Sequence, residues 1–193
     1  YATPLREYDE DGRLRRVEYR DTEGRRTLNS IGVAVEIHAA LPDNSSRLSN
    51  FGIDEEPVFD KAGVHSIVDV FGQQGELLSR RFEDVEGKPT YSADRFAEVH
   101  SSHDLRGYET RRRFLDPAGN PARGDSERCH GFAIERDEHG APLSTRCLDA
   151  TGAPRPVLGG RTDTPLSSGI AEVPIDRDWM TRSALPAIAV SSA

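Results

Sequence analysis

The sequence has little of what usually builds a thick hydrophobic core. Only 7% of its 193 residues are aromatic, and it contains one tryptophan and one methionine. No stretch approaches the roughly 20 consecutive apolar residues that a membrane-spanning helix needs, so we expect no transmembrane segment. Lysine is scarce, since only Lys61 and Lys88 occur among 25 basic residues, and the net charge is −8. Because nucleic-acid backbones bind basic surfaces, this charge argues against a nucleic-acid partner.

Sequence patterns of common active sites are also missing. The chain contains no G-x-S-x-G, P-loop or H-E-x-x-H motif, and we expect neither an enzyme nor a bound cofactor. His100 and His103 have a spacing that would suit a metal site on a helix. We expect these residues on a strand instead, where side chains three apart point to opposite faces. We therefore predict no metal site.

What the sequence does contain is a doublet of turns that recurs five times. The clearest copy is Asp9–Gly12 followed by Asp21–Gly24, and both turns read D-x-x-G. The first turns of the five copies begin 31, 32, 32 and 33 residues apart, at positions 9, 40, 72, 104 and 137. A period of this kind is typical of stacked units that share one continuous core. The copy that begins at Ala40 is worn, because its two turns, 40–43 and 52–55, lack the motif.

Each first turn is expected to join two antiparallel strands. Aspartate caps such a turn with its own side chain, and glycine adopts the positive φ at little steric cost. If the loop closes between residues 9 and 13, Tyr8 faces Leu14 and Glu7 faces Arg15, which gives one apolar and one opposite-charge pair. We predict an all-β fold of about ten antiparallel strands over residues 1–154, which form one elongated or curved sheet. Residues 155–193 break the period, and we expect an irregular C-terminal cap.

Bulky residues recur two positions before the second turn and predict a ladder of packed side chains: Tyr19, Asn50, Phe82, Phe114 and Cys147. Arginines cluster beside this ladder, and arginine next to aromatic rings is typical of surfaces that bind anionic glycans or acidic partners. Cross-strand salt bridges to glutamates such as Glu109 are the alternative reading. The residues that we select as candidate binding residues are Arg80, Arg81, Arg111, Arg112, Arg113, Phe82 and Phe114.

The two cysteines, Cys129 and Cys147, lie at opposite ends of the last predicted hairpin. In the expected register Cys147 faces Gly131, which makes Cys129 a diagonal neighbour near the upper limit of about 7 Å for a disulfide. Strand twist or a bulge would bring the pair within range. The sequence leaves open a disulfide, formed in an oxidising compartment, or two free thiols.

Two segments, Tyr8–Leu14 and Phe114–Pro121, resemble the tyrosine–aspartate (YD) repeats of bacterial Rhs-type proteins and related hairpin repeats of bacterial envelope proteins. The resemblance covers about residues 5–154. It implies a structural shell, surface adhesion or carbohydrate contact, and it implies no catalytic residue.

We therefore expect a non-enzymatic binding or scaffolding module that contacts a protein or glycan partner through a sheet face with arginine and aromatic side chains. The sequence has no signal peptide, and we expect a mature fragment or excised domain of a bacterial periplasmic or extracellular protein. Two alternatives remain: a ligand-binding or sensor ectodomain, and an accessory domain of a larger enzyme or toxin. A pocket lined by several repeat copies would favour the ectodomain.

Overall fold

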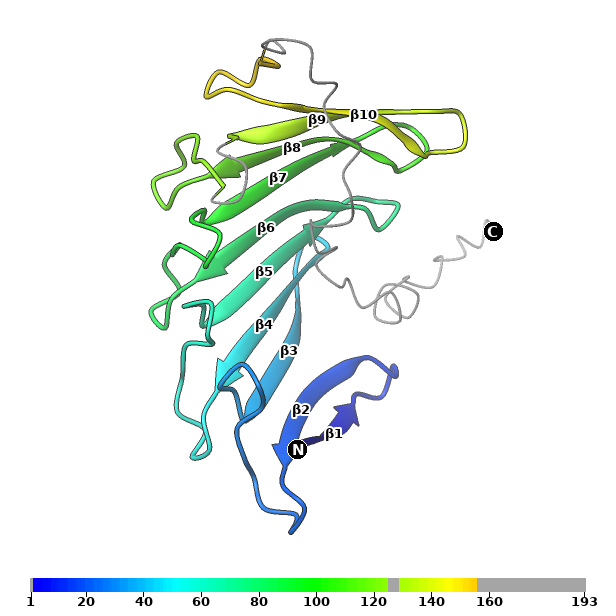
Figure 1. The fold of residues 1–193 in the computed structure, drawn as a ribbon. Helices are drawn as coiled ribbons and strands as arrows, with labels where there is room; N and C mark the ends of the chain where they lie inside the picture. Colours follow the sequence, from blue (N-terminus) through cyan, green and yellow to red (C-terminus); the bar gives the residue numbers. More distant parts are fainter. Residues whose placement is uncertain (1, 125–128, 156–193) are drawn as a thin grey trace, which may run out of the picture.

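The computed structural model describes residues 2–124 and 129–155, which form ten antiparallel strands in one open sheet (Figure 1). Strand order in the sheet follows the chain from β1 to β10, which confirms the all-β hairpin fold. The predicted cap lies outside the described residues, except for Arg155. The strands are β1 Thr3–Tyr8, β2 Leu14–Arg20, β3 Val35–Leu41, β4 Ser45–Phe51, β5 Ser66–Phe71, β6 Leu77–Glu83, β7 Glu98–His103, β8 Glu109–Leu115, β9 Gly131–Arg136 and β10 Pro142–Cys147.

The D-x-x-G turns are held by the aspartate side chain and a left-handed glycine. In the first turn the backbone N–H of Asp9 donates to the carbonyl of Arg13 (2.9 Å), and Gly12 has a φ of 76°. Oδ1 of Asp9 accepts hydrogen bonds from the backbone N–H groups of Asp11 and Arg13, at 3.0 and 2.8 Å. Backbone geometry alone therefore explains the aspartate and glycine at these positions.

The expected register is right at the turn and wrong one pair beyond it. Tyr8 faces Leu14 as predicted, but Glu7 faces Arg16 rather than Arg15. Arg15 is the extra residue of a β-bulge, which commonly follows a three-residue loop that ends in a left-handed glycine. The bulge moves every later side chain of the strand by one position, so it reverses which face each of them occupies.

The worn second copy folds differently from the prediction. Ala40 lies inside β3, and the turn is formed by residues 42–44, with Asp43 and Asn44 at φ values of 61° and 54°. Leu41 faces Ser45 directly, and the β3–β4 pair has no bulge. Asparagine and aspartate tolerate the left-handed region better than most residues, which explains how this hairpin turns without glycine. Strand β4 then pairs with β5 over five residues, from Ser45 to Ser49.

Two turns begin with glycine and take their carboxylate from a glutamate four residues later. Oε2 of Glu76 accepts a hydrogen bond from the backbone N–H of Gln74 (3.0 Å), and Glu56 does the same for Asp54 (3.0 Å). A Cβ atom on Gly72 would lie 2.1 Å from Oε1 of Glu76. The glutamate therefore occupies the space that an aspartate side chain fills in the other turns.

The first three connectors between repeats each contain a third turn, which was not predicted from the sequence. The backbone N–H of Asn29 donates to the carbonyl of Val33 (2.8 Å), and Oδ1 of Asn29 accepts from the N–H groups of Ile31 and Val33. Asp60 closes the same turn in the next unit with Val64. In the first two connectors an N-x-x-G or D-x-x-G motif, which starts eight residues after the first residue of the second turn, is the signal that predicts it.

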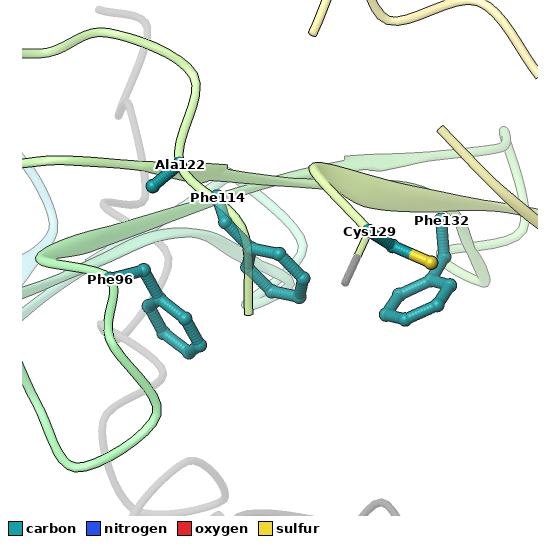
Figure 2. Packing of buried hydrophobic residues seen from close by; sticks show 5 residues of the cluster. All are labelled: Phe96, Phe114, Ala122, Cys129 and Phe132. Carbon is teal, nitrogen blue, oxygen red and sulfur yellow. The ribbon is translucent and has the colours of Figure 1, made fainter. Parts of the chain in front are cut away.

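Buried apolar side chains form a cluster that consists of Phe96, Phe114, Ala122, Cys129 and Phe132 (Figure 2). Phe96 and Phe114 stack with ring centroids 4.5 Å apart, and Phe132 meets Phe114 edge-on at 5.8 Å. Cys129 and Cys147 are joined by a disulfide with Cα atoms 5.3 Å apart. A bulge in the last hairpin places Cys147 opposite Phe132 instead of the predicted Gly131.

We predict that the two turn designs are interchangeable. Glu76→Ala should lower the free energy of unfolding by about 1 kcal/mol, because the N–H of Gln74 loses its acceptor. Gly72→Asp alone should be nearly neutral, and Gly72→Asp combined with Glu76→Ala should restore the lost stability. Urea unfolding measures all three, with Gln73→Ala as an exposed control in the same turn. If the double variant is no more stable than Glu76→Ala, the two kinds of turn are not interchangeable and the prediction is wrong.

The disulfide should contribute about 3 kcal/mol to the free energy of unfolding, since it closes a loop between residues 18 apart in sequence. Cys129→Ser with Cys147→Ser should lose this amount in urea unfolding. Added reductant should destabilise the natural sequence to the same extent and leave the double variant unchanged. An unfolding midpoint that is insensitive to reductant would contradict this estimate.

Candidate functional site

The candidate arginines do not share one face of the sheet. Adjacent residues of a strand point to opposite faces, so the register separates neighbours such as Arg80 and Arg81. Two arginines lie on the face of the aromatic ladder, and three lie on the other face. The members on the aromatic face are Arg80, Arg112, Phe82 and Phe114, and the members on the opposite face are Arg81, Arg111 and Arg113.

On the aromatic face both arginines are held by an acidic residue. Nε and Nη2 of Arg80 donate to the two carboxylate oxygens of Asp69, each at 2.7 Å. Arg112 makes the same two-pronged contact with Glu109, at 2.9 and 2.8 Å. Such paired hydrogen bonds are among the stronger polar contacts in proteins. These two guanidinium groups are therefore engaged in salt bridges within the sheet. The contact with Glu109 is the one that the salt-bridge alternative predicted.

The two candidate aromatic residues belong to the apolar core. Phe114 is 7% exposed and lies between Phe96 and Phe132. Phe82 is half-buried and meets Phe96 with ring centroids 5.9 Å apart. Figure 2 shows the rings of Phe96, Phe114 and Phe132 on one side of the sheet. Their burial gives them a packing role, so a partner on this face would meet few aromatic atoms.

The opposite face has an arginine from every even-numbered strand. We call Arg16, Arg47, Arg81, Arg113 and Arg146 the arginine row. The side chains of Arg47 and Arg81 are 40% exposed, and that of Arg146 is 49% exposed. The sequence reading missed Arg47 and Arg146, although each even-numbered strand has an arginine three or five residues before its second turn.

A buried carboxylate links two members of the arginine row. Glu83 is 1% exposed, and it accepts hydrogen bonds from Nη2 of Arg47 at 3.1 Å and from Nη2 of Arg81 at 2.7 Å. Arg47 and Arg81 both face Val68, on either side of β5. A buried charge needs such partners, because an unpaired one is strongly destabilising. Glu83 therefore fixes the positions of two half-exposed guanidinium groups on this face.

A second buried carboxylate, Glu18, organises the start of the row. It accepts hydrogen bonds from Arg16 (3.3 Å) and Arg26 (3.0 Å), and Nη2 of Arg20 lies 2.9 Å away. Arg16 and Arg26 also share Oε1 of Glu55, at 2.6 and 2.9 Å. Burial alone would raise the pKa of Glu18, but the bonds from Arg26 and Arg16 outweigh it and hold the pKa below its usual range.

The histidines do not converge on a metal centre. His100 contacts Glu98 on its own strand, with Nε2 2.8 Å from Oε1. Residues 2–124 and 129–155 contain no group of three or more histidine, cysteine or acidic side chains placed to hold a metal ion. No helix in that part of the chain has the length and hydropathy to cross a membrane.

Comparison of the chain with protein-family models and with curated proteins finds no match.

Glu18 should make the stability of the protein depend on pH. Its pKa is lower in the folded than in the unfolded state, so its contribution is complete above the unfolded pKa and is lost as the pH falls through the folded pKa. The stability difference between the natural sequence and Glu18→Gln should be largest at neutral pH and should shrink from about pH 5 towards pH 3. Urea unfolding across this range measures it, with the exposed Glu10→Gln as control. A difference that is the same at pH 7 and pH 3 would contradict the prediction.

Proposed function

We propose that this chain is a non-enzymatic binding module of a bacterial envelope or secreted protein, and that an anionic protein or glycan partner contacts the arginine row. The observation that carries the proposal is that all five even-numbered strands place an arginine on the same face of one continuous sheet. This proposal replaces the mixed arginine and aromatic face expected from the sequence.

The spacing of the row suits a partner with repeated negative charges. Neighbouring strands lie about 4.8 Å apart, so arginines on alternate strands recur about every 10 Å. Arg47 and Arg81 illustrate this, because each faces Val68 from the neighbouring strand. Guanidinium groups bind carboxylates and sulfates through paired hydrogen bonds. An extended polyanion laid across the strands would meet one guanidinium after another, and it would compete for them with Glu55, Glu83 and Glu135, the acidic partners within the sheet.

Two further observations support an extracytoplasmic module. The disulfide between Cys129 and Cys147 is of a kind that persists in the periplasm or outside the cell. The resemblance to YD repeats and envelope hairpin repeats points to the same compartments and to adhesion or carbohydrate contact. The net charge of the chain is −8, so the protein as a whole repels a polyanion. Salt screens charges more than about 10 Å apart, and attraction to the polyanion therefore acts only close to the arginine row.

The test uses two polyanions, polygalacturonate as a glycan and poly-glutamate as a polypeptide. Replacing Arg81, Arg113 and Arg146 with glutamine should weaken binding of the preferred polymer at least about tenfold at low salt, because each loses a charged hydrogen bond. The control replaces Arg6, Arg25 and Lys88 with glutamine, which makes the same change in net charge away from the row. Biolayer interferometry measures both variants. Equal loss in the two, or no binding of either polymer, would overturn the proposal.

A further inference from the structure

A cleft lies over the worn second copy, on the face of the aromatic ladder. It has a volume of about 190 Å³, and residues of the first three repeat copies line it. The tip of the β1–β2 hairpin forms one wall, and strands β3 to β6 form the floor. Its lining includes Arg15 from the hairpin, His38, Ala40 and Leu48 from the second copy, and Ile67 and Asp69 from the third.

The cleft exists because the second copy has a small residue where the other units have large ones. Ala40 lies seven residues after Val33, which closes the third turn of the preceding connector. The same position in the later units is occupied by large side chains, namely Phe71, His103 and Arg136. The unusual turn of this copy and its small residue thus leave a hollow in an otherwise filled face.

The first hairpin leaves the sheet at its tip and closes the hollow from one side. Strand β2 pairs with β3 only from Arg16 to Glu18. On the side of β3, the bulge and the turn that precede Arg16 therefore have no paired strand, although β1 still pairs with Leu14 on the other side. In Figure 1 the tip of the β1–β2 hairpin splays away from β3. Leu14 and Arg15 reach the cleft from this tip.

The floor of the cleft is apolar and electrically neutral. Leu48 and Ile67 face each other across β4 and β5. The ion pair of Arg80 with Asp69 lies beside them, and its two hydrogen bonds of 2.7 Å satisfy both groups. A ligand would therefore gain contact with aliphatic carbon here, and it would find no uncompensated charge on the floor.

Two polar side chains of the wall have unused hydrogen-bonding capacity. Arg15 is exposed and forms no ion pair with any residue that the structure describes. Nε2 of His38 is buried and has no hydrogen-bond partner among those residues, and the nearest carboxylate oxygen, from Glu36, is 3.8 Å away. A buried nitrogen without a partner is unfavourable unless a ligand or water completes its hydrogen bond. Both side chains can donate to an anion.

We propose that this cleft binds a small monocarboxylate with an apolar body. The carboxylate accepts hydrogen bonds from the guanidinium of Arg15 and from Nε2–H of His38, and the apolar part packs on Leu48 and Ile67. A dry cavity of about 150 Å³ accommodates benzene, so the observed volume suits a single ring or a short branched chain. The arginine row lies on the opposite face, and Arg47 is the only one of its members that also lines the cleft. The site supports the ligand-binding alternative for the protein.

Isothermal titration calorimetry with benzoate tests the site, and benzamide serves as the neutral ligand of the same shape. Benzoate should bind saturably, and benzamide should bind at least about tenfold more weakly because it lacks the charge. Arg15→Gln should reduce benzoate affinity by a similar factor. Arg25→Gln, an exposed arginine in a second turn, should leave it unchanged.

Ala40→Phe provides the steric test, because it restores the large residue that the third unit has at Phe71 and fills the cleft. Benzoate binding should be lost while circular dichroism and thermal unfolding remain those of a folded sheet. If Ala40→Phe does not fold, Arg15→Gln decides the question, since this exposed side chain has no structural partner. Absence of benzoate binding, equal affinity for benzamide, or unchanged affinity in Arg15→Gln would overturn the proposal.

Discussion

The structure depends on one local interaction, the hydrogen bonds by which a turn carboxylate accepts two backbone N–H groups. In the first turn Asp9 supplies this carboxylate, and Gly12 supplies the left-handed residue that follows. That geometry adds a bulge to the next strand, and the bulge determines which face each later side chain occupies. The side chains that share each face of a hairpin therefore depend on it. Where the turn begins with glycine, Glu56 or Glu76 supplies a carboxylate from the other side of the turn and accepts one backbone N–H group.

Much of the fold was predictable from sequence, because turn chemistry is local. The same turn motif also recurs in several copies, so a copy that lacks the motif does not hide the pattern. The aspartate and glycine positions predict the hairpins and their order. The register was wrong by one because a single inserted residue such as Arg15 looks like any other strand residue in sequence. The third turn was missed at Asn29, where asparagine replaces aspartate. The turn of the second copy could not be placed by analogy, since it uses Asp43 and Asn44 in a geometry that occurs in no other described first turn.

The candidate binding residues were less predictable than the fold, because the register of the strands decides on which face of the sheet each side chain lies. Runs such as Arg111–Arg113 attract attention in sequence, yet alternation places the middle arginine on the other side. The arginine row is visible only when positions three and five before each second turn are compared across copies. The cleft was not predicted from the sequence, and one of its walls comes from a hairpin tip that leaves the sheet. Long-range contact of this type leaves no local pattern.

The short pairing between units also bears on how such an array changes in evolution. Three of the four junctions between hairpins, including those of β6 with β7 and β8 with β9, contain only three residue pairs each. Side chains supply the rest of the attachment, because Phe82 meets Phe96 and Phe114 meets Phe132 across two of these junctions. The junction of β4 with β5 is longer and ties the second copy to the third through five residue pairs. We therefore expect that a duplicated or deleted unit is tolerated where the new neighbours restore the aromatic contacts between copies.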